Sequence, residues 1–294
     1  MSARDITPDF LRSWLLPSLP SGSDKETRGR VLVVAGGAEI PGAAVLAGLG
    51  ALRAGAGKLQ MAAPVSVARQ MAFEVPEARV IPVAEREGGD LSPEAADALV
   101  ALAARTDVVV LGPGMMDETV ACDLAGTLTS SPTEAAFVFD AAALTALVAQ
   151  ADQLLKAAGR IVLTPHAGEM AALLGIEKSR VEADPPAAAR EVARNLGAVV
   201  VMKGETTWIA SPDGVTWRHD SGAVGLATSG SGDVLAGVIG GLLARGAPAA
   251  QAAIWGVALH GAAGAALTEA IGALGFLARE ILPEVPRALA RLAR

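Results

Sequence analysis

Residues 225–233 read GLATSGSGD, and the apolar run VLAGVIGGLL follows directly at 234–243. Gly230 and Gly232 allow left-handed backbone angles and close backbone approach. The apolar run predicts a buried helix, whose N-terminus would offer unpaired N–H groups and partial positive charge to a phosphate. Asp233 would lie in the first turn of that helix. It is therefore either a favourable first-turn acid or a base for a hydroxyl that attacks the phosphate.

The composition indicates an acidic chain that can bury a large core. The 294 residues are 52% hydrophobic and carry a net charge of −7. Without a basic run we expect no nucleic-acid partner, whereas backbone N–H groups can still bind a small anion. The single cysteine, Cys122, excludes an intrachain disulfide and fits a reducing compartment. We expect it to be a small apolar residue on a helix.

The longest apolar stretches, at 234–244 and 252–267, fall short of the roughly 20 residues that span a bilayer. The N-terminus is not followed by a hydrophobic signal region. These features predict a cytoplasmic protein without a membrane partner. We also expect a homo-oligomer, with a tetramer among the candidates, since the apolar helices near 234–267 can pack within or between subunits.

Short β-branched runs alternate with helical segments along most of the chain. Strands are expected at 30–35, 58–63, 79–83, 107–111, 136–140, 160–164 and 198–203, with helices at 8–16, 43–54, from 64, 92–104, 117–129, 167–174 and 185–196. A hairpin at 207–211 and 215–219 precedes helices at 233–244, 249–269 and 278–293. The alternation predicts an α/β fold in three layers, with a mostly parallel sheet covered on both faces. No long linker divides the chain, so we expect a single domain over 1–294.

Ligands of such sheets bind at the carboxyl ends of the strands, and several loops at those ends carry suitable groups. Lys203, with Gly204, Glu205, Thr206 and Thr207 after it, offers a cation and hydroxyls to a nucleotide, or is a surface lysine. His166 is a polar ligand contact or a structural histidine. Asp140 either orients magnesium or a substrate hydroxyl, or caps a helix over 141–148.

Other nucleotide and catalytic motifs are missing from the sequence. We find no Walker A loop, no G-x-G-x-x-G after the first strand and no G-x-S-x-G elbow. Three histidines and one cysteine make a zinc site improbable. Any nucleotide chemistry must therefore use a different phosphate-binding loop.

Several motifs occur together in a characteristic order. They are GG at 36–37, PGAA at 41–44, LRAGAG at 52–57, GPG at 112–114, LTPHAGE at 163–169, KG at 203–204, GSGD at 230–233 and LHG at 259–261. In this order and spacing the chain resembles the ADP/ATP-dependent NAD(P)H-hydrate dehydratases of the ribokinase-like superfamily. The resemblance covers about residues 5–292. About 29 residues precede the first strand, so we expect no N-terminal epimerase domain of the kind that some relatives carry.

The resemblance implies a repair reaction on hydrated NADH or NADPH. Members of the family phosphorylate the hydroxyl at C6 of the nicotinamide ring of the S-epimer with ADP or ATP, and loss of phosphate restores the ring. Asp233 would be the base, and residues 230–233 would stabilise the phosphoryl group. By position, Lys203 to Thr207, Gly230, Ser231 and Gly232 would contact the nucleotide, and Ala43, Gly114, His166 and Asp233 the hydrated dinucleotide. Mg²⁺ would bridge the phosphates, and a separate epimerase would be a partner.

The sequence departs from the family pattern at two places. Ala223 and Val224 stand where the family usually has Asn and Pro, and Ala142 replaces a second acid after Asp140. Two alternative functions stay open, the first because its members also use a glycine-rich loop and the second because of these departures. One is a small-molecule kinase of the same superfamily, acting on a vitamin precursor or a sugar. The other is a nucleotide-binding protein without catalysis.

Overall fold

The computed structural model describes residues 3–18, 22, 24–220 and 222–294. Ten strands form one sheet in the order β1-β10-β9-β8-β7-β6-β5-β2-β3-β4. Strand β9 is antiparallel to both of its neighbours, and the other pairs are parallel. This confirms the mostly parallel sheet. The strands are β1 (Arg4–Asp5), β2 (Arg30–Val34), β3 (Lys58–Pro64), β4 (Ala78–Val83), β5 (Val108–Leu111), β6 (Ala136–Phe139), β7 (Ile161–Leu163), β8 (Val199–Met202), β9 (Thr206–Ala210) and β10 (Thr216–Asp220).

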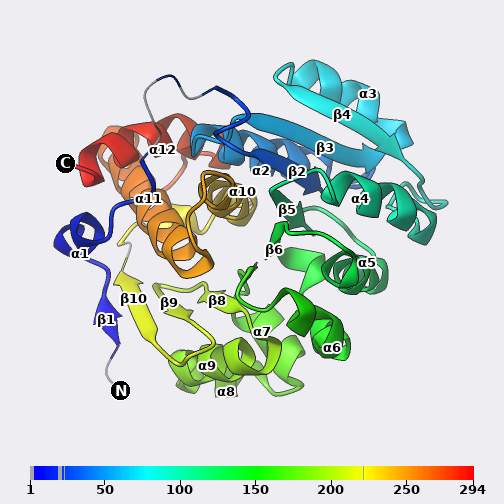
Figure 1. The fold of residues 1–294 in the computed structure, drawn as a ribbon. Helices are drawn as coiled ribbons and strands as arrows, with labels where there is room; N and C mark the ends of the chain where they lie inside the picture. Colours follow the sequence, from blue (N-terminus) through cyan, green and yellow to red (C-terminus); the bar gives the residue numbers. More distant parts are fainter. Residues whose placement is uncertain (1–2, 19–21, 23, 221) are drawn as a thin grey trace.

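Helices cover both faces of the sheet and form the outer layers (Figure 1). On one face lie α2 (Pro41–Arg53), α3 (Val65–Glu74), α10 (Ser231–Ala244), α11 (Ala249–Ala270) and α12 (Ala278–Leu292), with α1 (Pro8–Ser13) at their edge. On the other lie α4 (Ala96–Ala103), α5 (Glu118–Ser130), α6 (Ala151–Leu154), α7 (Ala167–Leu174), α8 (Lys178–Ala183) and α9 (Pro185–Leu196).

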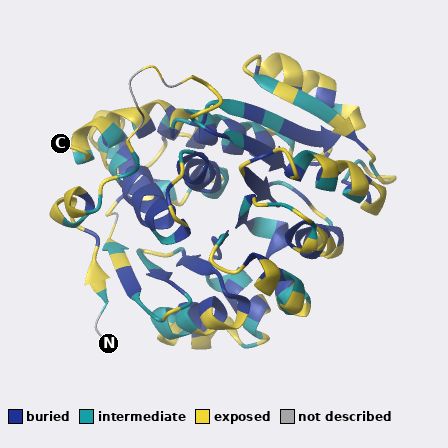
Figure 2. Ribbon diagram, in the orientation of Figure 1, coloured by how far each residue is buried: buried dark blue, intermediate teal, exposed yellow. Residues whose placement is uncertain are grey.

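The central strands contribute alternate residues to two separate cores. In β5, Val108 and Val110 face the core under α10, whereas Val109 and Leu111 face the core under α5. All four side chains are fully buried. Burial on both faces explains why these strands are continuous apolar runs in the sequence. Figure 2 shows the buried strands at the centre of the molecule and the exposed residues on its outer surface.

Glycines let α10 lie directly against α2. An ideal Cβ on Gly237 would lie 2.0 Å from the carbonyl oxygen of Ala47, and one on Gly241 would lie 2.3 Å from that of Ala51. Neither position can carry a side chain without moving a helix. The glycines after Asp233 therefore determine how closely α10 packs against α2. They also fix the position of the N-terminus of α10.

Several local features differ from the sequence expectations. Residues 141–148 do not form one helix: a 3-10 turn at Ala141–Ala143 is followed by another at Leu147–Gln150. Ala141 has a left-handed φ of 50°, so the chain does not pass from β6 into a regular helix. The short elements β1, α6 and α8 were not expected, because two, four and six residues carry too little periodicity.

A last difference is the extent of the apolar segment in α11, whose bounds agree with the expected helix to within one residue. Its 22 residues are long and apolar enough to cross a bilayer, contrary to the expectation from residues 252–267. However, 78% of its most apolar window is buried inside the protein, and its side chains from Ala252 to Leu259 form part of the core. We therefore describe α11 as a core helix.

Candidate active site

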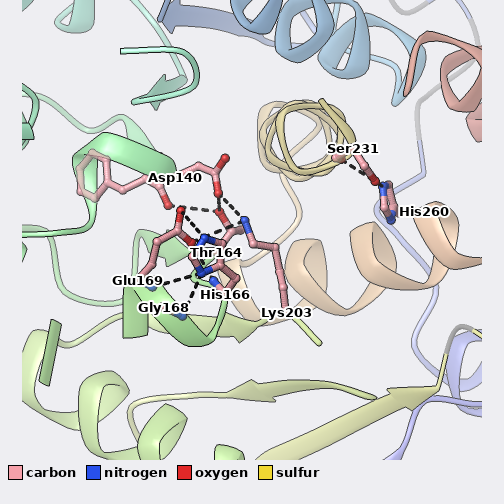
Figure 3. Close-up of polar contacts among 9 residues, drawn as sticks. Asp140, Thr164, His166, Gly168, Glu169, Lys203, Ser231 and His260 are labelled. Carbon is pink, nitrogen blue, oxygen red and sulfur yellow. Dashed lines mark hydrogen bonds and ion pairs between the residues drawn. The ribbon is translucent and has the colours of Figure 1, made fainter. Parts of the chain in front are cut away.

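Three parallel strands end beside the N-terminus of α10. Strand β6 is followed by Asp140, β7 by Thr164 and His166, and β8 by Lys203. A parallel bridge between His166 and Lys203 continues the pairing of β7 with β8. Because the carboxyl ends of parallel strands share one edge of the sheet, Asp140 and Lys203 meet although they are 63 positions apart. Figure 3 shows these side chains pointing toward one another below α10.

Asp140 is the buried acid of this cluster, with an exposed fraction of 2%. Its Oδ1 accepts hydrogen bonds from Thr164 Oγ1 at 2.6 Å and from Lys203 Nζ at 2.8 Å. The side chain makes no capping bond to the turn that follows. The alternative that Asp140 is a helix cap is therefore wrong, because its acceptor oxygen is used by a cation and a hydroxyl.

Lys203 is held as an ammonium, and its side chain is 21% exposed. Burial by itself would lower its pKa, but the charges of Asp140 and Glu169 outweigh burial, so the pKa lies above its ordinary value. Glu169 Oε2 lies 3.9 Å from Nζ. Lys203 is thus a permanent cation with a fixed position, and the alternative of an exposed surface lysine is wrong.

The glycine loop brings the N-terminus of α10 to this cation. Gly230 is the residue before the helix and has a φ of 87°, which favours glycine. An ideal Cβ on Gly232 would lie 3.3 Å from Lys203 Nζ and 3.9 Å from Asp140 Oδ2. The absence of a side chain at 232 leaves the first-turn N–H groups next to the ammonium. An ammonium and the free N–H groups of a helix N-terminus are groups that can bind a phosphate.

Asp233 lies in the first turn of α10, as predicted. Burial raises its pKa, the charges of Asp140 and Glu169 raise it further, and Lys203 opposes them, with a resulting pKa of about 7. A carboxyl group with a pKa near neutrality can accept a proton and later release it, as a general base must. An exposed acid in the first turn of a helix lacks the burial and the neighbouring carboxylates that raise the pKa of Asp233.

His166 is oriented by a capping box at the start of α7. Its Nδ1 accepts hydrogen bonds from the N–H groups of Gly168 at 3.0 Å and Glu169 at 3.1 Å. In return, Glu169 Oε2 accepts from the N–H of His166 at 2.7 Å. Since Nδ1 is an acceptor, the ring proton is on Nε2. His166 therefore combines the structural role and the capacity to donate a hydrogen bond to a ligand.

A cavity of about 960 Å³ connects these groups, a size typical of ligand pockets. Of the residues singled out from the sequence, the wall includes Asp140, His166, Lys203, Gly204, Glu205, Thr207, Ser231, Gly232 and Asp233. Thr206 is not among the wall residues, because its Oγ1 donates to Asp220 Oδ1 at 2.6 Å. Gly230 does not line the cavity either. An ideal Cβ on Gly230 would lie 2.6 Å from Leu46 Cδ1.

Ala43 and Gly114 form a separate pair at the same edge of the sheet. They follow the adjacent strands β2 and β5, and an ideal Cβ on Gly114 would lie 2.6 Å from the Cβ of Ala43. The same Cβ would lie 2.6 Å from the carbonyl oxygen of Ile40. Gly114 is therefore needed for the two loops to close on each other. Neither residue lines the 960 Å³ cavity.

The departures from the family pattern have unequal consequences. Ala223 lines the cavity, so a polar side chain is replaced by a methyl group in its wall. Val224 lines it too and is 69% exposed. Ala142 is buried in the core under α5 and is not a wall residue. The missing second acid therefore removes no charge from the cavity surface.

Sequence reasoning did not assign roles to three residues of the site. Thr164 and Glu169 complete the network around Asp140 and Lys203. His219 lines the cavity from β10, its Nδ1 has no hydrogen-bond partner among the described residues, and burial lowers its pKa. Thr164 follows a strand directly, as Asp140 does, and this position could have marked it as a site residue. His219 carries no such signal in the sequence, because it lies inside a strand of the hairpin.

A second cavity of about 610 Å³ lies at the opposite edge of the sheet. Its wall includes Arg30, Arg105 and Arg160. The guanidinium of Arg30 donates to the carbonyl of Arg105 at 3.0 Å, and that of Arg160 donates to the carbonyls of Thr133 and Ala135. These cations satisfy carbonyl groups near helix ends, so we assign them a structural role.

A family model described as NAD(P)H-hydrate dehydratase matches residues 31–287. The chain is 47% identical over 292 residues to the ADP-dependent (S)-NAD(P)H-hydrate dehydratase of Xanthomonas campestris pv. campestris. That match covers 99% of this chain and 98% of the relative.

Solved structures agree with this relationship. The ADP/ATP-dependent NAD(P)H-hydrate dehydratase of Bacillus subtilis, co-crystallised with ATP and Mg²⁺, has a TM-score of 0.83 at 29% identity and covers 99% of both chains. A ribokinase-like superfamily protein of Enterococcus faecalis V583 also has a TM-score of 0.83, at 25% identity over 99% of this chain and 96% of that one. The predicted ribokinase-like fold is confirmed.

Proposed function

Because the chain belongs to the NAD(P)H-hydrate dehydratase family, we propose that it is the enzyme that restores NADH and NADPH from their S-hydrates. The phosphoryl donor would be ADP, the donor named for the Xanthomonas relative, with ATP as the alternative. The observation that carries the proposal is the meeting of Asp233, Lys203 and the N-terminus of α10 at one cavity. A base, a cation and N–H donors are what phosphoryl transfer to a hydroxyl requires.

In the first step Asp233 accepts the proton of the C6 hydroxyl, and the hydroxyl oxygen attacks the terminal phosphorus of the nucleotide. The bond from that phosphorus to the nucleotide breaks, and AMP leaves when ADP is the donor. The ammonium of Lys203 and the first N–H groups of α10 stabilise the charge on the phosphoryl oxygens. In the second step the C6–O bond breaks, phosphate leaves, and loss of a proton from the neighbouring ring carbon restores the double bond.

The remaining contacts are divided between the two substrates. Residues 203–207 and 230–232 would hold the nucleotide, with Thr206 and Gly230 acting through the backbone or by supporting their neighbours. His166 would donate its Nε2 proton to the hydrated dinucleotide, a role supported by the acceptor bonds at Nδ1. Ala43 and Gly114 would contribute the closed loop pair beside it.

Mg²⁺ is part of the proposal, and the residues present fit it. Asp140 Oδ2 lies 3.9 Å from the ideal Cβ of Gly232 and takes part in no hydrogen bond among the described residues. The part of the chain that the structure describes has no group of three or more metal-binding side chains. Mg²⁺ commonly uses one or two carboxylates together with nucleotide phosphates. Asp140 would hold such an ion, which would neutralise phosphate charge when bound.

Recovery of NADH absorbance near 340 nm tests the proposal directly. Purified protein with hydrated NADH, ADP and Mg²⁺ should restore the absorbance, and a parallel reaction with ATP measures donor preference. No recovery with either nucleotide would contradict the proposal. A stable phosphorylated vitamin precursor or sugar would favour the kinase, and nucleotide binding without any turnover would favour the non-catalytic alternative.

The pH profile should report the unusual pKa of Asp233. The base must be ionised, so kcat/KM should fall about tenfold for each pH unit below about 7. The charge of Lys203 lowers this pKa, so Lys203→Met should move the acidic limb to higher pH, in addition to lowering the rate. Lys178→Met, on the surface of α8, is the control and should leave the profile unchanged. An acidic limb near pH 4 in the wild type would contradict the assignment.

Three features of the cellular context complete the proposal. A reducing cytoplasm is supported by the buried free thiol of Cys122. A homo-oligomer, with a tetramer among the candidates, stays a prediction that sedimentation can check. A separate epimerase that supplies the S-epimer is supported by the stereochemistry named for the Xanthomonas relative.

A further inference from the structure

His260 is a buried histidine to which the mechanism so far gives no role. It belongs to the core helix α11 and contacts the first residue of α10. Its Nε2 lies 3.0 Å from Ser231 Oγ and 3.1 Å from the carbonyl oxygen of Ser231 (Figure 3). Ser231 is itself buried and lines the cavity between Thr228 and Gly232. One imidazole nitrogen therefore contacts two oxygens of a residue in the phosphate-binding loop.

The protonation state of His260 follows from its surroundings. Burial lowers its pKa, the hydrogen bond to Ser231 opposes this, and the charges of Lys203 and His219 lower the pKa further, with a resulting pKa of about 4. The ring is thus neutral near pH 7 and carries one N–H. If Nε2 carried no proton, its lone pair would face a lone pair of the Ser231 carbonyl oxygen, which lies 3.1 Å from Nε2, and the two would repel. With the proton on Nε2, the ring donates to both oxygens of Ser231.

This tautomer decides what the hydroxyl of Ser231 can do. Its oxygen accepts from His260, so its proton is free to be donated elsewhere. Ser231 is the first residue of α10, immediately before Gly232, where the ammonium of Lys203 lies. A phosphate oxygen bound at this loop would be an acceptor for that proton.

We propose that His260 is a positioning residue that holds the hydroxyl of Ser231 as a hydrogen-bond donor to the transferring phosphoryl group. The inference rests on the proposed function, since it names phosphoryl oxygens as the acceptor. It adds a fourth kind of contact to the cation, the helix N–H groups and the base. It also explains a polar side chain in a helix whose other side chains from Ala252 to Leu259 are buried and apolar.

Four variants separate positioning from packing. Ser231→Ala removes the donor, His260→Leu removes its support, and His260→Gln keeps an N–H at nearly the same reach. We expect kcat to fall roughly ten- to hundredfold for Ser231→Ala, the range for a hydrogen bond to a charged group, and about tenfold for His260→Leu. His260→Gln should recover to within about threefold of wild type. The double variant Ser231→Ala/His260→Leu should be no slower than Ser231→Ala alone.

These four variants decide whether His260 acts through Ser231. Additive losses in the double variant would overturn the proposal, because His260 would then act independently of Ser231. Equal losses for His260→Leu and His260→Gln would also overturn it, because packing would then be the cause. Near-UV circular dichroism and thermal midpoints of the four proteins show whether each variant has folded.

An observation without turnover distinguishes failure of this inference from failure of the proposed function. The chain has three histidines, so ¹⁵N-imidazole NMR of the full protein can assign His260 by comparison with His260→Gln. We expect the neutral Nε2–H tautomer, unchanged between about pH 6 and pH 8. The Nδ1–H tautomer would overturn the inference even in an active enzyme. If the Nε2–H tautomer is found but hydrated NADH is not repaired, the proposed function fails and the geometry of the loop stands.

Discussion

Replacing Asp233 by Asn is expected to lower turnover of hydrated NADH by about 10²–10⁴-fold while the protein keeps its fold, and Asp233→Ala should do the same. The amide cannot accept the proton of the attacking hydroxyl. The N–H groups of α10 and the ammonium of Lys203 remain in place, so nucleotide binding should survive. Single-turnover rates and calorimetric nucleotide affinity measure the two effects separately.

The same substitution should change stability in the opposite direction from activity. The folded-state pKa of Asp233 is about 7, above its ordinary value of 3.8, so the fold favours the protonated form. Any stability from this group is complete below about pH 4 and is lost as the pH rises through 7. Since Asn never ionises, Asp233→Asn should be more stable than wild type above neutral pH, by about 1–3 kcal/mol, and equal to it near pH 4.

Asp97 offers a matched control on another helix. It is an exposed acid in the first turn of α4, so it has the helix-start role without the burial or the neighbouring charges. Asp97→Asn should leave turnover unchanged and alter stability by less than about 1 kcal/mol. If Asp233→Asn retained wild-type turnover, or resembled Asp97→Asn in both measurements, Asp233 would be a helix-start acid and the base would have to be sought elsewhere.

Gly237→Ala is expected to destabilise the protein by at least about 3 kcal/mol. Its Cβ would lie 2.0 Å from the carbonyl oxygen of Ala47 and 2.7 Å from the carbonyl carbon, so α2 and α10 would have to separate. Backbone atoms cannot turn aside as a flexible side chain can. A shift of α10 would also move Asp233 and Gly232 relative to Lys203, so nucleotide affinity should fall in the protein that remains folded.

The control for this substitution is Gly42→Ala in α2. Gly42 is exposed, and an added Cβ would meet no atom of the described residues within 4 Å. Alanine favours the helix over glycine, so this variant should be as stable as wild type or more stable by up to about 1 kcal/mol. Urea unfolding of both variants gives the comparison. Equal midpoints for Gly237→Ala and wild type would show that the two helices can part without cost.

Much of the fold could be predicted because its signals are local. The run at 108–111 is apolar on both faces of a strand, and Gly175 and Gly197 end α7 and α9 at the positions where the periodic patterns stop. The fold could not be predicted at 141–148, where Ala141 takes a left-handed φ. That angle arises where the chain leaves β6 for the active site, and helix propensity carries no information about it.

The sequence by itself determined the order of the longer strands and helices, the glycine loop before Asp233, and the set of polar residues at strand ends. These depend on periodicity, glycine and charge within a few neighbouring positions. Only the tertiary structure decided that Lys203 pairs with Asp140, that Asp233 has a pKa of about 7, and that His260 supports Ser231. The physical reason is that ionisation and hydrogen bonding depend on burial and on charges brought together from distant strands, and a linear pattern does not contain those distances.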